Sequence, residues 1–337
     1  MTRLTQAIKN LTRLTSLSTR VLADSTGATA FVQRPPSYTL PPFVNIGAAG
    51  YFGGGNDTGN ISGIDKIAFP ADTKTTLSAT LTSARNGLAG MANSAVAGYF
   101  GGGFDGSNIS GIDKITFAGD TKSTLSATIT TARTQLAGMA DSAVAGYFGG
   151  GTSGPNLSGI DKITFPADTK TTLSATLTAG RSSLAGMANS AVAGYFGGGN
   201  QAAYVSGIDK ITFPADTKTT LSATLTTARE LLAGMADSGV AGYFGGGNGA
   251  TNRSDIDKIT FPADTKTTLS ATLTAATTEL AAMGNKGVAG YFGGGTTGTK
   301  VSGIDKITFP ADTKTTLSAT LTSARTLLAG MADSGVL

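Results

Sequence analysis

The stretch GYFGGG at residues 98–103, followed by IDKITF at 112–117 and LAGMADS at 136–142, decides the fold because it recurs along the chain. GYFGGG appears six times at a fixed interval of 48 residues, without insertion or deletion, starting at Gly50, Gly98, Gly146, Gly194, Gly242 and Gly290. A period of this length fits a propeller blade, a pair of helices or a long β-solenoid turn.

The local chemistry of the repeat selects β-structure. Glycine makes up 48 of the 337 residues, threonine is abundant, and IDKITF alternates with a period of two. We predict four strands in the repeat, called A to D, over residues 88–92, 95–100, 112–117 and 124–130. Turns at 93–94 and 118–120 join A to B and C to D, and a longer B–C loop follows the glycines. Four short antiparallel strands repeated radially form a β-propeller, so the expected fold class is an all-β, six-bladed propeller.

The phase of the repeat predicts how the ring closes. The first copy begins at strand B, with Tyr51, and the chain stops at Leu337, just before another Gly-Tyr-Phe would begin. A spare strand A therefore lies at residues 328–337. Pairing it with the first blade would leave no open edge, and this predicts a ring of six blades closed by the C-terminal strand.

Three features of the repeat resemble the kelch family. They are the glycine run that closes the second strand (53–55), the aromatic residue that ends the third strand, and Arg85 after the fourth. The resemblance covers residues 50–337 and is to a divergent kelch repeat, because the chain lacks the tryptophan of that pattern. It implies a propeller in which the face that carries the B–C loops commonly binds ligands. Six near-identical blades of fixed length also resemble virion-associated repeat proteins of phages, which implies a tail-fibre, appendage or decoration role.

Residues 1–49 differ in kind from the repeat domain at 50–337. Apolar residues at spacings of three and four predict an amphipathic helix, followed by a proline-rich linker: Leu4, Ile8, Leu11, Leu14, Leu17 and Val21. The helix cannot bury this stripe against itself, so we expect it to anchor the protein to other virion proteins or to form homo-oligomers. A helix on a membrane surface and a targeting peptide are the alternatives.

Composition excludes most catalytic chemistry. The chain has no His, no Cys and only two Glu, which removes the Ser-His-Asp triad, thiol nucleophiles, zinc fingers and paired-Glu hydrolysis. We therefore expect no enzyme, catalytic residue, cofactor or metal. No apolar run is long enough to span a membrane. The net charge of +4 comes from residues 1–49, which hold five basic residues and one acidic residue. The repeat domain therefore has no net positive charge that would attract nucleic acid.

Charged residues recur in every blade, and their placement favours structural roles. Each blade has an Asp-Lys pair in strand C (Asp65-Lys66) and an Asp and a Lys in the C–D turn (Asp72 and Lys74). Because each Asp has a Lys nearby, we expect a lattice of exposed ion pairs between blades and not a ring of carboxylates that binds metal. Arginine recurs at 85, 133, 181, 229 and 325, with Thr277 breaking the series. Hydrogen bonding of these arginines to loop carbonyls is favoured over an anion-binding mouth. GYFGGG ends a strand and opens no helix, so it is not expected to bind phosphate.

Comparison of the six copies with one another locates the variation. Nearly all differences lie in the B–C loop and in the pair of residues after the arginine position, in the D–A loop. Antiparallel order places both loops on one face, which suits a recognition surface on a constant scaffold; neutral drift in tolerant loops is the alternative. The candidate binding residues on this face are Phe104, Asp105, Tyr204, Arg253, Lys300, Glu230 and Glu279.

Together these features predict a non-enzymatic virion structural and binding protein. Its arm would bind other virion proteins, and its variable face would bind a host-surface protein or a glycan. A cytoplasmic kelch-like adaptor for protein–protein interaction and a propeller lectin are the alternatives.

Overall fold

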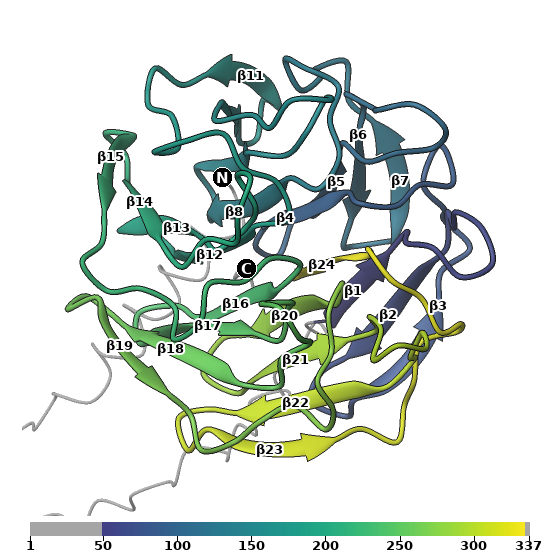
Figure 1. The fold of residues 1–337 in the computed structure, drawn as a ribbon. Coiled ribbons are helices and arrows are strands. Elements are labelled where there is room, and N and C mark those ends of the chain that lie inside the picture. Colours follow the sequence, from purple (N-terminus) through teal and green to yellow (C-terminus); the bar gives the residue numbers. More distant parts are fainter. Residues whose placement is uncertain (1–48, 334–337) are drawn as a thin grey trace, which may run out of the picture. The chain divides into compact units, whose positions relative to one another are not determined.

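The computed structural model describes residues 49–333, in which 24 strands form six four-stranded sheets arranged around an axis (Figure 1). These residues contain no helix. The innermost strand of each blade, strand A, lies next to the axis: β4 (Ala89–Asn93), β8 (Ala137–Asp141), β12 (Ala185–Asn189), β16 (Ala233–Asp237), β20 (Ala281–Asn285) and β24 (Ala329–Ala332).

Three further strands lie outside strand A in each blade, in the order B, C, D toward the rim. The B strands are β1 (Ala49–Gly53), β5 (Ala97–Gly101), β9 (Ala145–Gly149), β13 (Ala193–Gly197), β17 (Ala241–Gly245) and β21 (Ala289–Gly293). The C strands are β2 (Ile64–Ala68), β6 (Ile112–Thr116), β10 (Ile160–Thr164), β14 (Ile208–Thr212), β18 (Ile256–Thr260) and β22 (Ile304–Thr308). The D strands are β3 (Thr73–Thr76), β7 (Thr121–Thr124), β11 (Thr169–Thr172), β15 (Thr217–Thr220), β19 (Thr265–Thr268) and β23 (Thr313–Thr316).

The predicted closure of the ring is confirmed. β24 pairs antiparallel with β1, so the sheet that holds the first repeat has the order β24-β1-β2-β3. Tyr51 faces Met331 in this pair, and Tyr99 faces Met91 in the next blade, so the closing pair has the same register as an uninterrupted blade. The strand at the C-terminal end therefore removes the free edges of both the first and the last repeat.

The prediction for strand D is wrong. Strand D of the second blade is β7, not residues 124–130. After β7 the backbone leaves the ladder and makes widely spaced hydrogen bonds, from the N–H of Leu125 to the carbonyl of Ile112 and from Ile129 to Ser110. This path carries Thr130 to the next blade, where its backbone N–H and hydroxyl bind Asp161. The contact with the next blade therefore determines the path of this segment, and the alternating Thr-Leu-Ser-Ala pattern does not form the predicted strand.

The A–B turn also differs slightly from the prediction. The second strand begins at Ala97, so Ala95 and Val96 belong to the turn, where Ala95 has a φ of 58°. Val96 is therefore not a core residue but is 47% exposed.

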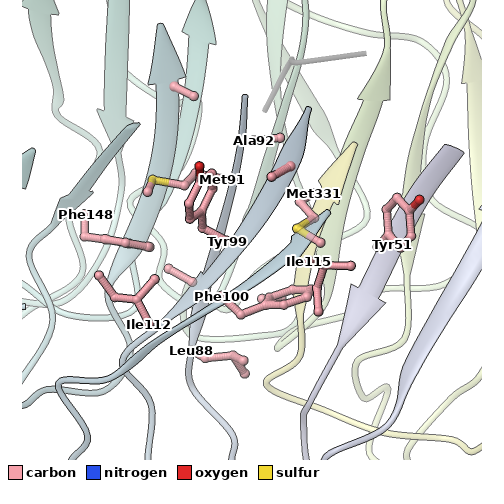
Figure 2. Packing of buried hydrophobic residues seen from close by; sticks show 14 of the residues in the cluster. Tyr51, Leu88, Met91, Ala92, Tyr99, Phe100, Ile112, Ile115, Phe148 and Met331 are labelled. Carbon is pink, nitrogen blue, oxygen red and sulfur yellow. The ribbon is translucent and has the colours of Figure 1, made fainter. Parts of the chain in front are cut away.

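The core lies between the blades, where buried hydrophobic side chains pack together (Figure 2). Two glycines of each strand B leave room for side chains of the neighbouring blades. A Cβ on Gly98 would lie 2.0 Å from the sulfur of Met331, and one on Gly101 would lie 2.5 Å from the ring of Phe148. Tyr99, Phe100 and Met91 are fully buried around them. Close approach of adjacent blades thus explains these two glycines of the GYFG segment.

Candidate functional site

Five of the six blades contain a buried arginine just before the inner strand. Arg85, for example, donates from Nη2 to the carbonyl of Phe100 and to Oδ2 of Asp113, both at 3.0 Å. Its counterparts make the same two contacts in their own blades: Arg133, Arg181, Arg229 and Arg325. All five side chains are at most 3% exposed. The structural role is confirmed, but the acceptors that all five share are a carbonyl of strand B and a carboxylate of strand C, not the predicted loop carbonyls. The alternative of an anion-binding mouth made by these arginines is wrong.

The carboxylate that meets each arginine is buried as well, contrary to the prediction of an exposed ion pair in strand C. Asp65 accepts hydrogen bonds from the backbone and hydroxyl of Thr322 and from the hydroxyl of Thr76. Burial acts to raise the pKa of Asp65, but these hydrogen bonds and the charge of Arg325 outweigh it and hold the pKa below its usual value. The same balance lowers the pKa of Asp209. These carboxylates tie the D–A loop to strand C.

A second network joins neighbouring blades, and here the predicted lattice of ion pairs is confirmed. Asp120, in a C–D turn, accepts hydrogen bonds from the hydroxyl of Tyr51 at 2.9 Å and from Lys66 at 2.7 Å in the preceding blade. The same trio occurs at all six junctions. Burial, and then the hydrogen bond to Asp120, raise the pKa of Tyr51 above its usual value.

The D–A loops close the central axis with a ring of backbone hydrogen bonds. The residue two places after each arginine position donates its N–H to the carbonyl of its counterpart in the preceding blade, over 2.6–2.9 Å. All six have a positive φ: Gly87, Gln135, Ser183, Leu231, Glu279 and Leu327. Behind this ring the inner strands touch, since a Cβ on Gly90 would lie 2.1 Å from the carbonyl oxygen of Gly330. Two cavities on the axis hold only about 70 Å³ each. As far as residues 49–333 define it, the axis therefore offers no deep binding channel.

The two variable loops lie on one face, as the strand order predicts. The N–H of Asn86, in a D–A loop, donates to the carbonyl of Phe104 in the B–C loop over 3.1 Å, and the N–H of Phe104 donates back over 2.8 Å. Equivalent bridges occur in all six blades. We call the surface formed by the B–C loops (56–62 and equivalents) and the D–A loops the loop face, and the surface of the A–B and C–D turns the turn face.

Two of the predicted binding residues stand out on the loop face. Phe104 and Tyr204 are 39% and 38% exposed, whereas the other phenylalanines and tyrosines in residues 49–333 are buried. Asp105, beside Phe104, is exposed too. Phe104 belongs to the blade of β4–β7 and Tyr204 to that of β12–β15, so a blade lies between them.

Arg253 and Lys300 are held by contacts within the loop face. Arg253 donates from Nε to Oδ1 of Asp255 at 2.8 Å, and Asp255 also binds the buried Arg229. Lys300 donates to Oδ1 of Asn56 at 2.6 Å, in the next blade, and to the carbonyl of Asp57. The structure distributes these two cations and the two aromatic residues over four blades and does not gather them into one cluster.

The two glutamates lie together near the axis. Glu279 is a member of the hydrogen-bonded ring, and Glu230 precedes the ring residue of the neighbouring blade. Burial raises the pKa of Glu230, hydrogen bonds from Asn200 and Ser183 oppose this rise, and the charge of Glu279 adds to it. Both side chains are partly buried. They place two carboxylates close to the axis on the loop face.

Sequence reasoning missed an apolar ring on the turn face. Val96 and its counterparts in four other blades are 40–47% exposed: Val144, Val192, Val240 and Val288. The signal is the valine that precedes Ala-Gly-Tyr-Phe in these five blades, which the predicted strand B of residues 95–100 includes as a strand residue. The turn face therefore varies little in sequence, with Lys286 in place of a serine as one exception, and it carries exposed apolar side chains.

The predicted anchoring residues 4–21 lie outside the described part of the chain. Within residues 49–333, no group of three or more His, Cys, Asp or Glu side chains could hold a metal ion. A search of the same residues finds no helix with the length and hydrophobicity to cross a membrane. In comparisons with known proteins, no family model matches the chain and no curated protein sequence does so either.

Proposed function

We propose that this protein is a non-catalytic binding module whose propeller presents the loop face to a macromolecular partner. The observation that carries the proposal is the position of the internal variation. The six repeats are nearly identical in the core, the cross-blade trio and the turns, yet they differ on one face whose loops are hydrogen-bonded together. Variation confined to one surface of a rigid scaffold is typical of recognition.

Phe104 and Tyr204 are the proposed anchors of the interface. The counterparts of Phe104 are Asn or Thr in every other blade, and four of the five counterparts of Tyr204 are Asn. Asn60 and Asn156, at the Tyr204 position in other blades, donate to the carbonyl of the first loop residue in the next blade. Tyr204 replaces the asparagine that makes this hydrogen bond, and its ring is exposed to solvent. Exposed aromatic side chains are frequent hot spots of protein interfaces.

The absence of catalysis is part of the proposal. Without His or Cys, catalysis would rest on Asp, Lys, Arg or Tyr. The repeated Asp, Arg, Tyr and strand-C Lys side chains described above hold loops to strands or blades to each other. These structural roles support a protein that binds and does not catalyse.

In its most specific form, the proposal places the protein on a phage virion as a divergent kelch-type propeller. The fixed repeat length and the amphipathic pattern of residues 1–49 support this placement, with the arm attached to other virion proteins and the propeller directed toward a host-surface protein or glycan. A cytoplasmic adaptor or a lectin would use the same loop face, so the identity of the partner separates these roles.

A capture experiment with matched variants tests the proposal. The full-length protein is immobilised and incubated with an extract of its source cells or particles, and retained proteins and glycans are quantified by mass spectrometry. F104S/Y204S alters the loop face, and V144S/V192S removes two exposed apolar residues from the turn face. We expect ligands that the wild type and V144S/V192S retain and F104S/Y204S loses. Ligands lost only by V144S/V192S, or no ligand retained by the wild type, would contradict the proposal.

A further inference from the structure

One blade departs from the arginine network. In the blade of β20–β23, drawn in green to yellow in Figure 1, the arginine position holds Thr277. Thr277 is 7% exposed, and its hydroxyl donates to the carbonyl of Ala275 at 2.9 Å. It is too short to reproduce the arginine contacts with strands B and C. The blade is otherwise built in the same register as the others.

The acceptors that bind the guanidinium in the other blades remain in this one. By the repeat, the carbonyl of Phe292 and Oδ2 of Asp305 correspond to the two acceptors of every arginine. The carbonyl of Gly303 corresponds to a third, since Arg133 Nη1 donates to the carbonyl of Gly159 at 3.1 Å. All three residues line one cavity of about 410 Å³, together with Thr277. This volume lies within the range of small-ligand sites.

The carboxylate of this blade is also less shielded than its counterparts. The side chain of Asp305 is 12% exposed, whereas those of the five arginine-paired aspartates are 0–2% exposed. Its Oδ2 accepts a hydrogen bond from the N–H of Thr274, but no arginine within residues 49–333 reaches it. Lys314 lies 3.3 Å from Oδ1, on the side of the carboxylate away from the arginine position, as the equivalent lysines do in the other blades. Asp305 thus has one cation where its counterparts have two.

We propose that this cavity binds the guanidinium group of an external ligand, at the place that an arginine of the chain occupies in five other blades. The planar group would donate to Oδ2 of Asp305 and to the carbonyl of Phe292, as all five internal arginines do at their own positions, and to the carbonyl of Gly303, as Arg133 does to that of Gly159. The apolar walls of Leu273 and Leu280 would cover the alkyl part. The ligand is either an arginine side chain of a partner protein or a free guanidino compound. This inference does not depend on the proposed role of Phe104 and Tyr204.

The full-length protein is titrated with agmatine, with the blocked peptide acetyl-Gly-Arg-Gly-amide and with 1,5-diaminopentane, which replaces the guanidinium by an ammonium. Binding is followed by saturation-transfer NMR and by the rise in Tm. We expect saturable binding of a guanidinium ligand and binding of the diamine that is roughly tenfold weaker or more. Peptide binding would identify a partner's arginine as the source, and binding of agmatine alone would identify a free compound.

Three variants locate the site. T277R restores the residue of the other blades and should fill the cavity, so binding is lost while the Tm stays equal or rises. D305N keeps the shape of the side chain and should weaken guanidinium binding roughly tenfold or more. R181T empties the equivalent position of another blade and, if the variant folds, should create a second site. Equal binding by wild type and T277R, equal binding by wild type and D305N, or no binding of either guanidinium ligand by the wild type would overturn the proposal.

Discussion

The turn face and the loop face lie at opposite ends of the same 24 strands, but they differ in how much their sequences vary between blades. On the turn face each Asp of a C–D turn holds a Tyr and a Lys of the neighbouring blade, in six nearly identical copies. On the loop face the buried arginine contacts recur, yet the side chains above them differ from blade to blade. The comparison shows that the residues that join neighbouring blades are the same in every repeat. The solvent-exposed residues of the loop face, by contrast, differ between repeats.

The largest effect should come from breaking the closure on which both faces depend. Deleting residues 328–337 removes β24 and exposes the edge of β1. Loss of the buried Met331 alone is expected to cost about 2–5 kcal/mol, and the lost strand pairing adds to this. Urea unfolding of the full and shortened chains measures the effect, with deletion of 334–337 as the control for length. A midpoint unchanged by removal of β24 would disprove the closure as a source of stability.

A buried arginine should matter more than any side chain of the loop surface. R181M leaves the carboxylate of Asp209 buried without its guanidinium and is expected to destabilise the fold by about 3–5 kcal/mol. T277M is the matched control, because that blade has no arginine to lose, and its effect should be much smaller. Urea unfolding compares the two, since guanidinium salts would confuse the result. Similar losses for both variants would show that the arginine contact contributes little.

The threonine hydrogen bonds and arginine charges around the same carboxylates predict a loss of stability in acid. The folded pKa values of Asp65, Asp209 and Asp257 lie below the usual value of 3.8, so the unfolded state binds more protons in acid. Their contribution is complete above about pH 5 and falls as the pH drops below about 4 toward the folded pKa values. Urea unfolding at a series of pH values from 6 downward measures this slope. A constant free energy of unfolding through this range would refute the assignment.

The smallest effect on stability should come from the proposed anchors. Phe104 and Tyr204 are more than one-third exposed, and their replacement by serine is expected to change the free energy of unfolding by less than about 0.5 kcal/mol each. The single variants F104S and Y204S are compared with wild type by urea unfolding. A loss near that of R181M would place these rings in the scaffold and not in an interface.

The repeat made the number of blades, the closure and the common position of the B–C and D–A loops predictable, because each follows from phase and antiparallel order. The course of the chain after β7 was not predictable from local pattern, since Thr130 is drawn to Asp161 of another blade. The break at Thr277 was visible in the sequence, but the cavity beside it depends on Phe292, Gly303 and Asp305 converging from two other strands and a loop. Such convergence is a property of the packed fold.

The central claim is that the loop face, and not the turn face, is the binding surface. Hydrogen–deuterium exchange of the full-length protein, alone and with the ligand identified by capture, tests it most directly. The account predicts slower exchange on binding in the B–C loops around Phe104 and Tyr204, with no change at the A–B turns that carry Val96, Val144 and Val192. Protection of those turns, with the B–C loops unchanged, would contradict it and make the apolar ring the docking surface.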